Sequence, residues 1–192
     1  MIAQLVLGSV VAATLFLLPL GANAQAITVF GPDPDARKCF DSAKNAAEYN
    51  ATTPYARVPC TTALEAGKLR TKDKAATHVN RGILSMKLQE YSSAIGDFDA
   101  ARVLYPRYGA IYVNRGNVFF IRNRFPSAIA EYTEALDAEM DEYQVAYLNR
   151  GMAYEILGQF DAAEADYRQA LALAPEWGLA ISKLARVLGK QH

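Results

Sequence analysis

Asn80-Arg81-Gly82 lies in a stretch of the chain, Ala75 to Pro106, that recurs twice with variations. The tripeptide returns as Asn114-Arg115-Gly116 and again as Asn149-Arg150-Gly151, so its glycines lie 34 and then 35 residues apart. A constant period between about 20 and 50 residues is typical of a solenoid, in which each unit packs only against its neighbours. The sequence therefore predicts three stacked units of one kind.

The three stretches agree at many positions besides the tripeptide. When they are aligned on the glycine, each continues with an aromatic residue at a turn and then with a small, an aromatic and a small residue. These residues are Tyr91, Ala94, Phe98 and Ala101 in the first stretch; Phe125, Ala128, Tyr132 and Ala135 in the second; and Phe160, Ala163, Tyr167 and Ala170 in the third. Glycine inside a helix costs roughly 0.5–1 kcal/mol relative to alanine, so three glycines in register indicate closely packed helices. We expect each glycine to face the alanines of the second helix of its own unit.

This pattern resembles the tetratricopeptide repeat, a helix-turn-helix unit of about 34 residues. The family has a large residue early in the first helix and an aromatic residue three positions after the glycine. The chain supplies these with His78, Tyr112 and Tyr147, and with Phe119 and Tyr154. Ser85 and Met140 depart from the family pattern, which has an aromatic residue and a proline there. The resemblance implies an all-α fold: a right-handed superhelical solenoid of antiparallel helix hairpins.

The repeats themselves are expected to cover residues 75–108, 109–143 and 144–175. The last segment, residues 176–192, carries apolar residues at helical spacing and is expected to form a capping helix and a short tail. A solenoid needs such a cap, because the end repeat would otherwise expose the face that a further repeat would cover.

Before the repeats, residues 36–70 are interpreted as a degenerate leading hairpin. Cys60-Thr61-Thr62-Ala63-Leu64 resembles the later Tyr132-Thr133-Glu134-Ala135-Leu136, although the glycine of the first helix is absent. Residues 25–35 are predicted to be an extended linker, because they contain residues that interrupt helices and favour turns. These residues are Gly31, Pro32 and Pro34.

The first 24 residues carry no charged side chain and contain a nearly continuous apolar run, Leu5 to Leu20. The run ends in the small-x-small triplet Ala22-Asn23-Ala24, which is typical of a secretory signal peptide cleaved after Ala24. An uncleaved membrane anchor is the alternative, because the run approaches the ~18–20 apolar residues needed to span a bilayer. We therefore expect a protein that is periplasmic or secreted, or else anchored in the inner membrane.

Cys39 and Cys60 are the two cysteines of the chain, and one lies on each predicted helix of the leading hairpin. An even number of cysteines in an exported chain favours a disulfide. A disulfide that closes the loop between Cys39 and Cys60 would stabilise the fold by roughly 3 kcal/mol, because it lowers the entropy of the unfolded chain. A redox or metal-binding pair is the alternative, but the sequence has no CxxC motif.

The composition argues against several classes of function. The chain carries 20 basic and 20 acidic side chains, whereas a nucleic-acid partner favours a basic patch. The sequence contains no glycine-rich phosphate loop, no HExxH motif and no GxSxG nucleophile elbow. The two histidines are His78, expected in the core, and His192, the last residue. We predict no catalytic residue, no cofactor, no metal site and no nucleic-acid partner.

The resemblance implies that the first helices of successive hairpins line a concave groove, which holds a peptide from a partner protein. Asn80, Asn114 and Asn149 match the family position whose asparagine commonly bonds the backbone of the bound peptide. An amide suits this role because it donates and accepts hydrogen bonds at once. The alternative is that these asparagines bond only to the adjacent hairpin. By helical spacing, we expect six neighbours to share the groove face: Val79, Ile83, Val113, Asn117, Leu148 and Met152.

The arginines of the three tripeptides are expected to bridge acidic residues of adjacent hairpins, with anion binding as the alternative. Taken together, the sequence predicts a non-enzymatic adaptor that binds a protein or peptide partner, placed in the periplasm of a Gram-negative bacterium. A membrane-anchored assembly factor is one alternative. An enzyme or ligand carrier is another, and a deep closed pocket with converging ionisable groups would favour it. Self-association through the exposed end of the solenoid is a further expectation.

Overall fold

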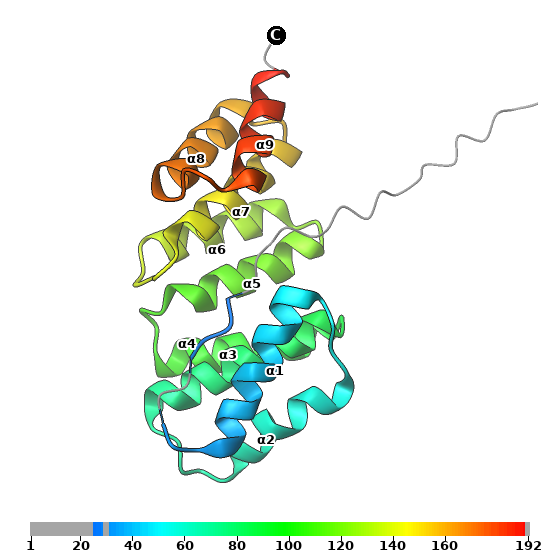
Figure 1. Ribbon diagram of the computed structural model, residues 1–192, viewed down its shortest axis with the longest axis vertical. Coiled ribbons are helices and arrows are strands. Elements are labelled where there is room, and N and C mark those ends of the chain that lie inside the picture. The colour runs from blue at the N-terminus through cyan, green and yellow to red at the C-terminus, as the bar shows by residue number, and fades with distance from the viewer. Residues whose placement is uncertain (1–24, 29–30, 191–192) are drawn as a thin grey trace, which may run out of the picture.

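Figure 1 shows the computed structural model of the chain, which describes residues 25–28 and 31–190. Within these residues the chain forms helices and no β-strand, and the helices stack along one axis from α1 and α2 to α9. This confirms the all-α solenoid. The predicted leader, residues 1–24, and His192 lie outside the described residues. No helix of the described part is long and apolar enough to cross a membrane.

The described residues contain nine α-helices and one short 3₁₀-helix. In chain order they are α1 (Pro34–Tyr49), η1 (Pro54–Arg57), α2 (Val58–Glu65), α3 (Thr71–Lys87), α4 (Tyr91–Leu104), α5 (Gly109–Ile121), α6 (Phe125–Leu136), α7 (Tyr143–Ile156), α8 (Phe160–Leu173) and α9 (Gly178–Leu188). The strongest contacts join α3 to α4, α5 to α6 and α7 to α8, which are the three hairpins. The helix α1 packs against both α2 and α3, so the leading hairpin continues the stack.

Each hairpin closes where a glycine of its first helix meets an aromatic ring of its second. A Cβ atom added to Gly82 would lie 2.5 Å from the ring of Phe98, and one added to Gly116 would lie 2.6 Å from the ring of Tyr132. Gly151 and Tyr167 repeat this geometry at 2.8 Å. The expectation that alanines face the glycines is therefore wrong. The rings lie directly over the glycines, because only a residue without a side chain leaves room for them.

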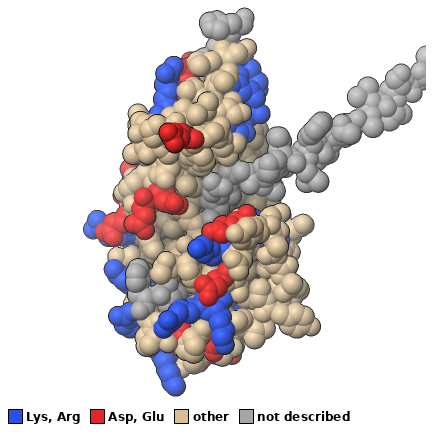
Figure 2. All heavy atoms as spheres, viewed as in Figure 1, with Lys and Arg blue, Asp and Glu red and all other residues tan. Residues whose placement is uncertain are grey.

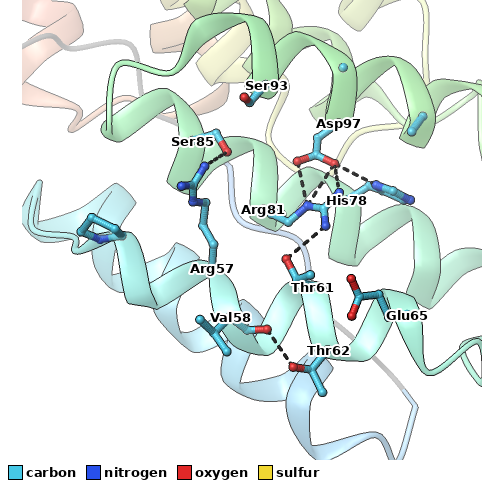
Figure 3. Close-up of a pocket in the computed structure, with 13 residues that line it drawn as sticks. Arg57, Val58, Thr61, Thr62, Glu65, His78, Arg81, Ser85, Ser93 and Asp97 are labelled. Carbon is cyan, nitrogen blue, oxygen red and sulfur yellow. Dashed lines mark hydrogen bonds and ion pairs between the residues drawn. The ribbon is translucent and has the colours of Figure 1, made fainter.

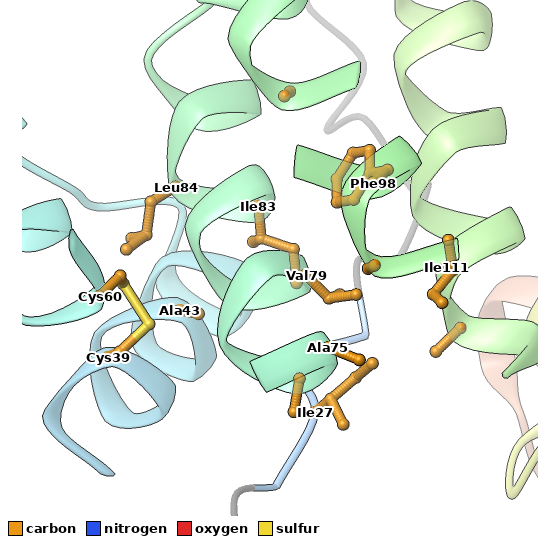
Figure 4. Close-up of a cluster of buried hydrophobic side chains, with 14 of the residues drawn as sticks. Ile27, Cys39, Ala43, Cys60, Ala75, Val79, Ile83, Leu84, Phe98 and Ile111 are labelled. Carbon is orange, nitrogen blue, oxygen red and sulfur yellow. A yellow bond between two sulfur atoms is a disulfide. The ribbon is translucent and has the colours of Figure 1, made fainter. Parts of the chain in front are cut away.

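The disulfide between Cys39 and Cys60 joins α1 to α2, with 4.8 Å between the two Cα atoms. Both cysteines are fully buried, and they lie beside Ala43 and Leu84 in the apolar cluster of Figure 4. This bond fastens the leading hairpin, which has a neighbouring hairpin on one side only.

The helix α9 covers the other end of the stack, where it packs against α8 and α7. Its buried residues are Ala180 and Val187, and Arg186 donates a hydrogen bond of 2.6 Å to Glu155 of α7. Burial alone would raise the pKa of Glu155, but hydrogen bonds from Arg186 and Tyr167 more than offset it and lower that pKa. The cap is thus held by both apolar packing and a charged contact.

The sequence predicts an extended linker over residues 25–35, and the described part of it, residues 25–28 and 31–35, packs against the repeats or begins α1. Residues 25–28 lie along α3 and α5, and Ile27 is only 3% exposed. The first helix begins at Pro34, where the side chain of Asp33 accepts hydrogen bonds from the backbone N–H groups of Asp35 and Ala36. Glycine and proline in a sequence favour an irregular backbone, but composition does not show where such a backbone packs.

We expect Gly116→Val to lower the free energy of unfolding by about 3 kcal/mol, because a side chain there must push Tyr132 and α6 away from α5. Thermal unfolding followed by circular dichroism measures this change. The matched control is Gly96→Ala in α4, where an added Cβ meets nothing within 4 Å. Removing this glycine should raise stability by about 0.5 kcal/mol. An unchanged midpoint for Gly116→Val would contradict the packing described above.

Replacing both Cys39 and Cys60 by alanine should lower the free energy of unfolding by about 3 kcal/mol. The double variant avoids leaving one free thiol, and equilibrium unfolding in urea measures the difference. Reducing agent should destabilise the natural chain and leave the double variant unchanged. If reductant affected both proteins equally, the stabilisation could not be assigned to this bond.

Candidate functional site

The three asparagines of the repeated tripeptide lie in a row on α3, α5 and α7, and each is fully buried. We call Asn80, Asn114 and Asn149 the asparagine ladder. The face of α3, α5 and α7 along which residues 25–28 lie is called the groove. The first two asparagines of the ladder bind those residues directly.

Asn80 holds Ile27 by both backbone groups. Its Oδ1 accepts a hydrogen bond of 2.8 Å from the N–H of Ile27, and its Nδ2 donates one of 2.8 Å to the carbonyl oxygen of the same residue. Asn114 binds Gln25 in the same way, at 3.1 Å and 3.0 Å. Because residues 25 and 27 are both held and residue 26 is not, the groove binds an extended backbone with a two-residue period.

The side chains of this segment add contacts on either side of the ladder. Ile27 packs into the apolar cluster that contains Ala75 and Val79 (Figure 4), and Nε2 of Gln25 donates a hydrogen bond of 2.9 Å to Glu142. Two smaller cavities, of about 250 and 290 Å³, flank residues 25–28, and Tyr108 lines both. Burial raises the pKa of Tyr108 to about 12, with further contributions from Asp141 and Tyr105. Its phenol is therefore neutral at physiological pH.

The third asparagine of the ladder has a different set of contacts. Nδ2 of Asn149 donates to Oδ1 of Asn117 at 3.0 Å, and the same oxygen accepts from the hydroxyl of Tyr132 at 2.9 Å. The Oδ1 of Asn149 is buried and has no hydrogen-bond partner among the described residues. One end of this amide therefore joins neighbouring hairpins, and the other end stays unsatisfied.

The six neighbours predicted to share the groove face are each at most 5% exposed with residues 25–28 in place, and none of them lines a cavity along the groove. They are Val79, Ile83, Val113, Asn117, Leu148 and Met152, and the first two belong to the apolar cluster that Ile27 enters. A first helix in this stack is covered by its own second helix and by both adjacent hairpins, so only a narrow strip faces the groove. That strip contains the residue four positions before each asparagine. These residues, Ala76, Ala110 and Val145, do line cavities along the groove.

The three arginines of the tripeptides form ion pairs, mainly within their own hairpins. Arg81 bonds to Asp97 of α4 at 2.8 Å, and Arg150 bonds to Asp166 of α8 at 2.8 Å. Arg115 pairs with Glu131 of its own hairpin and with Asp99 of the preceding one. Only this second contact is the bridge between hairpins that the sequence predicts. The other two arginines reach the preceding hairpin through threonines, Thr61 and Thr133.

A polar cavity of about 800 Å³ lies between α2, α3 and α4 (Figure 3). It is the place to look for the converging ionisable groups that an enzyme would need. His78 faces this cavity, rather than the apolar core, and bonds to Asp97 at 2.9 Å. Burial alone would raise the pKa of Asp97, but the hydrogen bonds from His78 and Arg81 more than offset it and lower that pKa. The nearby Arg57 pairs with Glu90 and donates to Ser85 at 3.3 Å. These charges neutralise one another, so the cluster resembles a structural ion-pair network.

No group of three or more His, Cys, Asp or Glu side chains that could hold a metal ion occurs among the residues the structure describes. Sequence reasoning also missed Gln25 and Ile27, which fill the groove, and Glu142, which contacts Gln25. The glycine and prolines that follow residues 25–28 suggested a linker. The one signal for burial was the apolar, β-branched character of Ile27 and its neighbours.

Two models of the tetratricopeptide repeat match the sequence, one over residues 79–143 and the other over residues 145–176. Together they cover just over half of the chain. No curated protein matches the chain in sequence.

Solved structures resemble the chain as well. The Arabidopsis OM64 TPR domain is 26% identical, with a TM-score of 0.59, and the likeness covers 63% of this chain and 99% of that domain. The second TPR domain of human RPAP3, solved in complex with an HSP70 peptide, is 22% identical with a TM-score of 0.57, covering 62% and 98%. The MamA protein is 18% identical with a TM-score of 0.61, covering 82% of each chain. The last two show likeness of fold alone.

We expect Asp97→Asn to lower the free energy of unfolding by about 2 kcal/mol at pH 7, because it removes the charged partner of Arg81 and His78. The folded-state pKa of Asp97 is lowered, so its stabilisation is present above the unfolded pKa of about 4 and is lost as pH falls through the folded value. The deficit of the variant should therefore shrink below pH 4 in urea unfolding experiments. Asp41→Asn, an exposed change in α1, is the control. A deficit that did not change with pH would contradict this assignment.

Proposed function

Because the chain belongs to the tetratricopeptide repeat family, whose members generally mediate protein–protein interactions, we propose that it binds an extended segment of a partner protein in the groove. In this proposal the chain is a non-enzymatic adaptor. The asparagine ladder supplies the main contacts with the backbone of the bound segment.

The observation that carries the proposal is the pair of two-point contacts between the ladder and residues 25–28. Asn80 and Asn114 each bind both the N–H and the carbonyl of one residue, and these contacts use no feature of the bound side chains. Any extended segment can offer the same groups at the same two-residue period. The second TPR domain of human RPAP3, of similar fold, was solved with a peptide bound. That precedent supports a peptide as the ligand.

Residues 25–28 and a partner compete for the same atoms, because Oδ1 and Nδ2 of both Asn80 and Asn114 already bond to this segment. A segment of the same chain binds at an effective concentration of the order of mM. A partner must therefore bind more tightly than this internal segment, or else take the positions that the internal segment leaves free. We propose that the internal segment sets a threshold of affinity that excludes weak peptides.

We also propose that the protein acts in the periplasm or after secretion. Two observations support this: the apolar leader with its Ala22-Asn23-Ala24 triplet, and a disulfide between the only two cysteines. Disulfides persist in oxidising compartments and are rare in the cytosol. N-terminal sequencing of the protein from its host decides between a cleaved leader, with Gln25 first, and a retained membrane anchor.

The experiment that tests peptide binding is a crosslinking pull-down from the host with three forms of the chain. Ile27→Asp, which places a charge in an apolar site and releases residues 25–28, should capture more partner than the natural chain. Asn80→Ala with Asn114→Ala, added to Ile27→Asp, should lose that partner. Gln159→Ala, an exposed change outside the groove, is the control, and circular dichroism checks that each form is folded. Equal capture by all folded forms would exclude the groove as the binding site.

A further inference from the structure

We infer that the part of the groove beyond Gln25 binds the basic portion of a partner's extended segment, an inference that rests on the proposed peptide binding. A cavity of about 940 Å³ lies there, between the end of α1, the start of α7 and the turn before α9. We call it the acidic cavity. Its lining includes Glu48, Glu142, Val145, Glu176 and Trp177.

The acidic cavity is the third of three positions along the groove, one beside each of α3, α5 and α7. Four positions before each ladder asparagine lies a residue that lines a groove cavity: Ala76 beside Ile27, Ala110 beside Gln25, and Val145 in the acidic cavity. The first two positions are filled by residues 25–28. At the third, Gln25 is the one residue of the bound segment 25–28 that reaches the lining. A segment longer than 25–28 would continue into it.

Asn149 stands in α7 where Asn80 and Asn114 stand in α3 and α5, next to the cavity lining rather than in it. It lies one helical turn from Val145 and on the same side of α7, since residues four apart share a helix face. Its Oδ1 is buried without a hydrogen-bond partner among the described residues, whereas the Oδ1 atoms of Asn80 and Asn114 each accept a backbone N–H. A buried acceptor without a hydrogen bond is unfavourable. The N–H of a bound segment would relieve that cost.

The negative charge of the acidic cavity favours a basic segment. Three carboxylates reach it from three separate elements, and its lining contains no lysine or arginine. Glu142 already accepts a hydrogen bond from Gln25, and Glu48 has only a long contact of 4.0 Å with Lys44. The α6–α7 connection, residues 137–142, carries four acidic residues and no basic one. Figure 2 shows acidic side chains gathered along this flank of the stack.

A further feature favours a lysine or arginine side chain in this position. The indole of Trp177 offers an apolar surface for the long stem of a basic side chain and a ring face for its charge. Acidic segments would meet like charges there and bind less well.

The test uses three fluorescent peptides that differ only in charge. Each carries a copy of residues 25–30, preceded by Lys-Ala-Lys-Ala, Ser-Ala-Ser-Ala or Glu-Ala-Glu-Ala, so that the added residues reach the acidic cavity. Fluorescence anisotropy measures their affinity for the full, disulfide-bonded chain carrying Ile27→Asp. Ile27→Gly serves as a second released form if the first is unstable. We expect the lysine peptide to bind about tenfold more tightly than the serine peptide, and the glutamate peptide to bind least.

Variants of the chain test whether the preference for the lysine peptide arises in the acidic cavity. Glu48→Gln, Glu142→Gln and Glu176→Gln together should abolish it, while Asp41→Asn, Glu65→Gln and Glu134→Gln, which remove the same charge elsewhere, should leave it intact. Asn149→Ala should weaken all three peptides alike. The tenfold preference should also shrink in high salt, because these carboxylates are partly exposed.

The outcomes separate the two proposals. If none of the peptides binds either folded, released form, then the groove is not a peptide site and the proposed function fails. If all three bind with equal affinity, the groove binds peptides but the inference about the acidic cavity is wrong. The inference is also wrong if the lysine preference survives the triple glutamine variant.

Discussion

The close approach of a bare glycine to an aromatic ring is the constraint on which the rest of this structure depends. Gly82 under Phe98, Gly116 under Tyr132 and Gly151 under Tyr167 fix the distance between the two helices of each hairpin. The distance from a Cβ added at the glycine to the facing ring is nearly equal in the three hairpins. The hairpins therefore have the same thickness and stack in register. The asparagine two positions before each glycine is then carried to the same place in every hairpin. The ladder is thus a consequence of the packing, and the groove is a consequence of the ladder.

The fold could be predicted from the sequence because its main determinant is periodic. A recurring Asn-Arg-Gly with its later aromatic residue marks both helices of each hairpin, and the contacts they make are mostly local. The position of the aromatic ring over the glycine was harder to predict from the sequence. The spacing shows that alanine and aromatic residues alternate in the second helix, but not which of them contacts the glycine of the first helix. The disulfide was predictable for a different reason: the chain has two cysteines, and one pairing is available.

The site was predicted only in part. The asparagines that contact residues 25–28 were identified, but the predicted neighbours Val79, Val113 and Leu148 line none of the cavities along the groove. A helix in a stack has one narrow free strip, and periodicity does not say which strip it is. The occupant of the groove was missed for a deeper reason. Ile27 and Asn80 are 53 residues apart and Gln25 and Asn114 are 89 apart, and nothing in a local pattern relates residues at such distances.

Those same separations give the molecule an order of assembly. Hairpins form through contacts between neighbouring residues and are expected to fold early, whereas contacts between distant parts of the chain form late. Residues 25–28 have no binding site until α3 and α5 stand side by side, so we expect the groove to form before this segment fills it. Under the proposed function, a protein that meets the chain while it folds would encounter an open groove, and one that arrives afterwards would have to displace residues 25–28. The time of encounter would then select among partners as affinity does.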